Sequence, residues 1–164
     1  MGLYTTAAGI DATLTSTTQQ APLGQLLVEP AIMSGTRANQ GPRVWVYVLN
    51  AEAATNFVQG TIISRDLGAA TYAGNVAPLN APSAAIMGVA QHLLAFGSYG
   101  FIQKLGIGEV LADTGGITAD NALVVGNVVA GRADNAGAGV HAFAVSTETV
   151  AATALATCWI NAPG

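Results

Sequence analysis

Short β-like runs separated by turn residues are the feature that most constrains the fold of this chain. Glycine and proline occupy the gaps, for example at Gly41-Pro42, Ala77-Pro78 and Gly115-Gly116. Several short strands at such spacing are typical of an antiparallel sandwich or barrel. We therefore predict an all-β (mostly β) fold, a small antiparallel β-barrel or β-sandwich. The expected strands are residues 25–32, 43–49, 57–64, 86–91, 99–104, 108–112, 122–125, 140–145 and 154–160.

The run 43–49 is the clearest of these strands because its β-branched and aromatic residues suit a pleated surface. Trp45, Tyr47 and Leu49 alternate with three valines, and successive side chains of a strand point to opposite faces. Both faces are apolar, so we expect both to be covered.

Helix is expected only briefly. Residues 51–57 contain Ala-Glu-Ala-Ala, which has good helix propensity, and Asn50 before them is a favourable N-cap. Residues 66–73 are a weaker candidate. The sequence thus predicts at most one or two short helices.

The first residues differ from the rest of the chain. Residues 1–22 are rich in Thr, Ala, Ser and Gln, and their large apolar side chains are too widely spaced for a core helix. We predict an extended N-terminal arm over 1–22 and a single β domain over 23–164. The arm offers four apolar interface candidates, which are Leu3, Tyr4, Ile10 and Leu14.

Charge is scarce in this sequence. Charged residues make up 9% of the 164 residues, against roughly 25% in an average soluble protein. The hydrophobic share is 51%, and contact with other protein subunits would cover such a surface. Isolated charges can fix the register of an interface, which makes the single arginines candidates for contact. These candidates are Arg37, Arg43, Arg65 and Arg132.

The charge pattern and the lengths of the apolar stretches each argue against one kind of partner. The basic residues are scattered and the formal net charge is −4, whereas a nucleic-acid footprint needs clustered cations. No apolar stretch approaches the roughly 20 residues of a membrane-spanning helix. We therefore expect neither nucleic acid nor membrane as a partner.

No motif indicates catalysis, a cofactor or a metal. His92 and His141 are the only histidines, and no metal-ligand spacing connects them to other ligands. The glycines at 106 and 108 begin like a dinucleotide fingerprint, but Leu111 stands where the third glycine belongs. We predict a protein that is not an enzyme, in which Cys158 is a small buried side chain and turn aspartates such as Asp113 bind backbone amides.

The C-terminal half contains a series of short motifs: a Gly-Val-Ala strand, a Gly-x-Tyr-Gly-x-Ile-Gln strand and a following hairpin. The residues concerned are 88–92, 95–103, 106, 110–113, 119–125, 130–134, 140–145 and 156–160. In these motifs the chain resembles capsid decoration or cement proteins of tailed bacteriophages.

This resemblance implies a small β-barrel or β-sandwich, often a homotrimer, on the outer surface of an icosahedral head. There it would bind the major capsid protein and stabilise contacts between its subunits, with no catalytic residues. Two other functions remain open. One is a different virion β-domain, associated with the tail or a fibre. The other is a carbohydrate-binding module with an aromatic platform from Trp45, Tyr47 or Tyr72.

Overall fold

Almost all regular structure in this chain is β-strand. The computed structural model describes residues 11–31, 33–36, 38–66, 68, 72–137 and 140–164. Within these residues the only helical element is a single 3-10 turn, η1 (Ser83–Ala85), so the all-β prediction is confirmed. The strands are β1 (Leu26–Glu29), β2 (Arg43–Asn50), β3 (Ile62–Arg65), β4 (Ala73–Val76), β5 (Ile86–Val89), β6 (Tyr99–Leu111), β7 (Ala122–Val125), β8 (Ala133–Asn135), β9 (Ala144–Ser146) and β10 (Leu155–Asn161).

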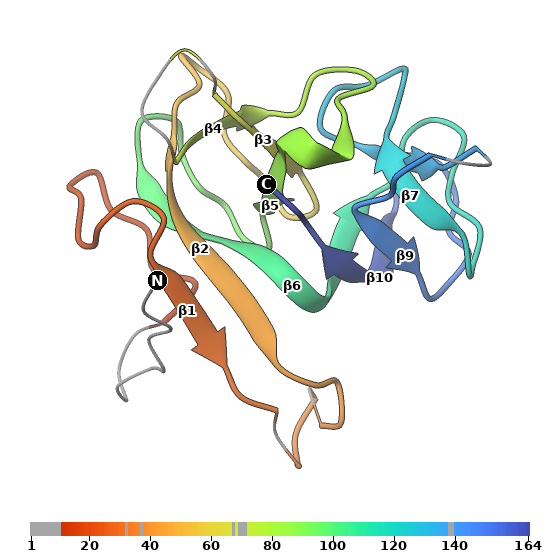
Figure 1. The fold of residues 1–164 in the computed structure, drawn as a ribbon, viewed down its shortest axis with the longest axis horizontal. Coiled ribbons are helices and arrows are strands. Elements are labelled where there is room, and N and C mark those ends of the chain that lie inside the picture. The colour runs from red at the N-terminus through yellow and green to blue at the C-terminus, as the bar shows by residue number, and fades with distance from the viewer. Residues whose placement is uncertain (1–10, 32, 37, 67, 69–71, 138–139) are drawn as a thin grey trace.

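Five of the strands close into a barrel. The strands share one hydrogen-bonded sheet in the order β1-β2-β4-β3-β5-β6-β10-β9-β7-β8, and β2 also pairs with β6. This extra pairing closes β2, β4, β3, β5 and β6 into a ring. The predicted barrel is therefore present, although β2 and β4 meet in parallel at Leu49–Ala73 and Asn50–Gly74. In Figure 1 the β1–β2 pair projects from one side of the barrel and β7 to β10 lie on the other.

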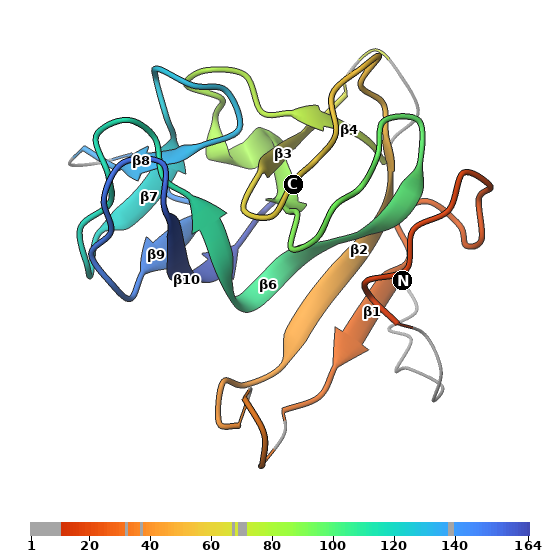
Figure 2. The ribbon, with the colours of Figure 1, turned by 180° about the vertical axis from the view of Figure 1, so that it is seen from behind.

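The long strand β6 connects these two sides. The sequence predicts two strands here, 99–104 and 108–112, and that prediction is wrong because the chain continues as one strand of 13 residues. Residues up to Leu105 pair with β2, and residues from Leu105 onward pair with β10. At the change of partner Gly106 has φ +103°, and a Cβ there would lie 2.5 Å from the carbonyl oxygen of Pro42. Glycine thus lets β6 curve between its two partners, as Figure 2 shows.

The predicted helix at 51–57 is absent, since these residues form bends and an isolated bridge at Phe57. Asn50 still organises the segment, but as a turn. Its Nδ2 donates to the carbonyl oxygens of Thr55 and Leu94, both at 3.0 Å, and its Oδ1 accepts from the amide of Glu52 at 3.1 Å. The weaker helix candidate, 66–73, lies partly outside the described residues, and Ala73 begins β4.

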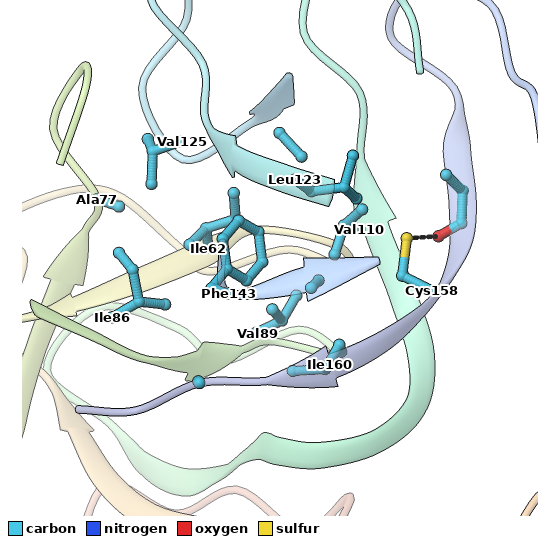
Figure 3. Close-up of a cluster of buried hydrophobic side chains, with 14 of the residues drawn as sticks. Ile62, Ala77, Ile86, Val89, Val110, Leu123, Val125, Phe143, Cys158 and Ile160 are labelled. Carbon is cyan, nitrogen blue, oxygen red and sulfur yellow. Dashed lines mark hydrogen bonds between the residues drawn. The ribbon is translucent and has the colours of Figure 1, made fainter. Parts of the chain in front are cut away.

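Three buried clusters hold the fold together. The first lies between the barrel strands β3 and β5 and the strands β7, β9, β10 and the end of β6, and it includes Phe143 and Cys158 (Figure 3). The second fills the barrel and includes Val46, Val48 and Ile102. The third covers the outside of β2 and consists of Ala12, Leu27, Trp45, Tyr47 and Phe101. Both faces of the 43–49 strand are therefore buried, as predicted.

Residues 11–21 of the predicted arm lie against the domain's own sheet. Ser16 and Tyr99 form an antiparallel bridge, with N–O distances of 3.0 and 2.7 Å. The amide of Gln20 donates to the hydroxyl of Tyr47 at 3.0 Å, and Ala12 is buried in the third cluster. The division of the chain at residue 22 remains a prediction.

Candidate functional site

The predicted interface residues that the structure describes lie on different elements. Arg43 begins β2 and Arg65 ends β3, whereas Arg132 comes just before β8. The guanidinium carbon of Arg65 lies 5.5 Å from the ring centre of Tyr72. Leu14 is strongly exposed, at 64% of its surface. The other candidates, Leu3, Tyr4, Ile10 and Arg37, lie outside the described residues.

The aromatic platform suggested for sugar binding does not exist as predicted. Trp45 and Tyr47 are each only 3% exposed. The Nε1 of Trp45 donates to Glu29 Oε2 at 2.8 Å, and the Tyr47 ring packs against Phe101 at a centroid distance of 5.0 Å. Tyr72 is half-buried. The rings of Trp45 and Tyr47 are buried because their strand is covered on both faces.

Asp113 binds backbone amides, as the sequence predicted for a turn aspartate. Its Oδ1 accepts from the amide of Thr114 at 2.8 Å, and its Oδ2 accepts from Val128 and Val129 at 3.0 and 3.3 Å. Burial alone would raise the pKa of this carboxyl, but the amide donors, helped by the charge of Arg132, lower it below the usual value. Asp113 therefore fixes the loop between β7 and β8.

His92 is half-buried in the loop that follows β5. Neither ring nitrogen has a hydrogen-bond partner among the described residues. Burial lowers the pKa of the imidazole, and the charge of Asp11 opposes this only in part. Across the part of the chain that the structure describes, no group of three or more His, Cys, Asp or Glu side chains could hold a metal ion. No described helix is long and apolar enough to cross a membrane.

The outer face of β10 carries an exposed apolar row that the sequence analysis did not identify. Ala156, Cys158 and Ile160 are buried in the first cluster, so the residues between them must face outward. Trp159 is 43% exposed and lies directly opposite Val145 on β9, itself 44% exposed. On its other side Trp159 pairs with Ile107 of β6. The prediction that Cys158 is buried already implied that Trp159 points outward.

A hollow of about 420 Å³ lies beside this row. We call it the outer hollow. Ile107 and Thr157, which neighbour Trp159 in the sheet, contribute to its wall. Its remaining lining is mainly polar and comes from the N-terminal segment, β1, β2, β6 and three loops. It includes Asp11, Glu29, Gln40, Arg43, Gln59 and Glu109.

Hydrogen bonds hold the polar side chains of the outer hollow in place. The Glu29 carboxylate accepts a hydrogen bond from the Trp45 indole, and the Glu109 carboxylate accepts one from the side-chain amide of Gln59. Arg43 Nη2 donates to Gln40 Oε1 at 3.3 Å. Amide donation from Thr13, supported by its hydroxyl, lowers the pKa of Asp11 below its usual value. The hollow thus presents three carboxylates and one guanidinium on a β scaffold.

One comparison identifies a solved structure of similar fold. No family model matches the sequence, and no curated protein matches it. Among solved structures, the chain is similar to the N base of the head fiber protein gp8.5 of bacteriophage phi29, with a TM-score of 0.56 and 17% identity. The similarity covers 73% of this chain and 94% of that chain. At this identity the two chains share a fold, and function does not follow from the likeness alone.

Proposed function

We propose that this chain is a structural protein of a bacteriophage virion, located on the outer surface of the capsid. The observation that carries the proposal is the similarity of fold to the head fiber base, which covers 94% of that chain. The C-terminal motifs support it independently, since they resemble capsid decoration proteins. The protein would act through contacts between subunits and would not be an enzyme.

The surface of the domain supports a role in assembly. Large apolar side chains of the described residues are exposed on several elements, and charged residues make up only 9% of the chain. Subunits that bind a lattice in many copies can use modest interfaces, because attachment at several points multiplies their effect. The exposed large apolar residues are Leu14, Met33, Val58, Leu79, Leu93, Phe96, Val128, Val140, Val145, Leu155 and Trp159.

Within this class we favour a decoration or cement protein. Its partner would be the major capsid protein, and it would assemble with itself as a homotrimer. Leu14 and the residues before it would contribute contacts to the shell. In this role the protein would hold neighbouring capsid subunits together against internal pressure.

A fibre base is the second candidate, and the structural neighbour supports it specifically. That neighbour is the N base of a head fiber, and 73% of the present chain is covered by the match. A fibre base would attach to the same outer surface, but it would support a projecting fibre and would not need to bridge capsid subunits.

Cryo-electron microscopy of the parent particle tests the proposal. We expect density for this domain on the outer surface of the head. Absence from the particle, or density inside the head or along the tail, would refute it. Particles lacking the protein separate the two candidates: loss of a cement protein should lower the temperature at which the heads release DNA, whereas loss of a fibre base should leave it unchanged.

A further inference from the structure

We propose that the outer hollow binds an uncharged saccharide, with Trp159 as the stacking surface at its rim. Nothing in this inference depends on where the protein sits in a particle. The volume of about 420 Å³ lies within the range of roughly 300–1,000 Å³ found for small-ligand pockets. The hollow is therefore large enough for a short saccharide.

Trp159 is placed to meet a ligand in the outer hollow. It pairs with Ile107, and Thr157 precedes it by two residues on the same strand face; both residues line the hollow. The far edge of the indole points toward the loop before β2, because a Cβ on Gly41 would lie 3.9 Å from Cη2. Gln40, which directly precedes Gly41 in that loop, also lines the hollow. The indole thus lies along the rim.

An exposed indole next to fixed polar groups suits a sugar ring. One face of a pyranose is a plane of C–H groups, which packs on an aromatic surface, while its hydroxyl groups need donors and acceptors at the edge. The outer hollow supplies acceptors from Glu109 and Glu29, and donors from Gln40 and Arg43. Because their hydrogen bonds already orient these side chains, little conformational entropy is lost on binding.

The charge of the outer hollow selects among saccharides. Three carboxylates, those of Asp11, Glu29 and Glu109, face a single guanidinium from Arg43. A sialylated or phosphorylated sugar would meet net repulsion there, whereas a neutral sugar would not. Anionic saccharides are therefore disfavoured, and an uncharged saccharide is the expected ligand because each of the three carboxylates already accepts a hydrogen bond within the chain.

The test begins with the 164-residue chain on an array of neutral, amino, sialylated and phosphorylated saccharides. The neutral saccharide that binds most strongly is then titrated while acrylamide quenching of tryptophan fluorescence is followed. Trp45 is 3% exposed and Trp159 is 43% exposed, so the quenchable signal comes mainly from Trp159. We expect the bound saccharide to reduce acrylamide quenching of Trp159 in the unmodified chain. This measurement does not depend on the folding of any variant.

Variants then test the residue directly. Trp159→Ala should weaken binding about ten-fold, because it removes both the packing of the indole on the sugar ring and the apolar area that the indole buries. Phe96→Ala is the matched control, because Phe96 is an exposed aromatic residue, at 51%, that does not line the hollow. Its affinity should be unchanged. The inference fails if no neutral saccharide binds, if charged saccharides bind better, or if Trp159→Ala binds as well as the control.

Discussion

Asp113 gives the sharpest test of how this fold is held together. Its carboxylate is 1% exposed and accepts three backbone amides from two separate loops. The loop of β7 and β8 approaches so closely that a Cβ on Gly126 would lie 2.2 Å from Asp113 Oδ2. Asp113→Asn keeps the shape of the side chain but removes the charge and turns one acceptor into a donor.

The loss of stability caused by Asp113→Asn can be estimated from these hydrogen bonds. Bonds to a charged acceptor contribute about 1.5–3 kcal/mol each and neutral ones about 1 kcal/mol, and the new amide group faces at least one backbone N–H. We expect Asp113→Asn to lower the free energy of unfolding by about 2–4 kcal/mol at pH 7. Urea denaturation followed by circular dichroism measures it. Asp120→Asn, at an exposed turn position with φ +61°, is the control and should change stability by less than about 0.5 kcal/mol.

The pH dependence of the free energy of unfolding provides an independent check. Because the pKa of Asp113 is lowered in the folded state, the unfolded chain takes up the proton first as the pH falls. The stabilisation is therefore complete above the ordinary aspartate pKa of about 3.9 and is lost as the pH falls through the lower, folded value. The difference between the two chains should shrink in strong acid. An equal difference at pH 7 and in strong acid, or one below about 1 kcal/mol at pH 7, would refute the reasoning.

Three further predictions follow from the fold. Gly106→Ala should lower the free energy of unfolding by at least about 2 kcal/mol in the same assay, because φ is +103° and the added Cβ would meet the Pro42 carbonyl oxygen. Cys158 should react with a thiol reagent at pH 8 only after unfolding, since burial raises the pKa of its thiol to about 12; rapid labelling of the native protein would contradict this. Deletion of residues 1–22 should leave the barrel folded but lower the melting temperature, because the cover over Tyr47 is lost; an unfolded product would show that this segment belongs to the core.

The sequence predicted the strands with strong β character and missed those without it. The 43–49 strand and the burial of Cys158 could be predicted because β-branched, aromatic and small apolar residues carry a clear pattern. β4 reads Ala-Gly-Asn-Val and β8 reads Ala-Asp-Asn, compositions typical of turns, and they are strands because neighbouring strands pair with them. Local propensity cannot reveal such pairing.

The candidate site was harder to predict than the fold. The outer hollow joins residues from the N-terminal segment, β1, β2 and β6, and no local spacing records that they meet. Trp45 is an aromatic residue in an apolar strand, and it is buried because both faces of that strand are covered. The alternation around a buried Cys158 instead predicts that Trp159 lies on the opposite, outward face.

The uninterrupted course of β6 gives the domain a mechanical property. The same backbone forms one wall of the barrel and pairs with β10 beside the first cluster, so no linker separates the two cores. A force applied to the β1–β2 side reaches β7 to β10 through covalent bonds and through hydrogen bonds loaded along the strand direction. The two sides should therefore resist pulling as one rigid body and unfold in a single step.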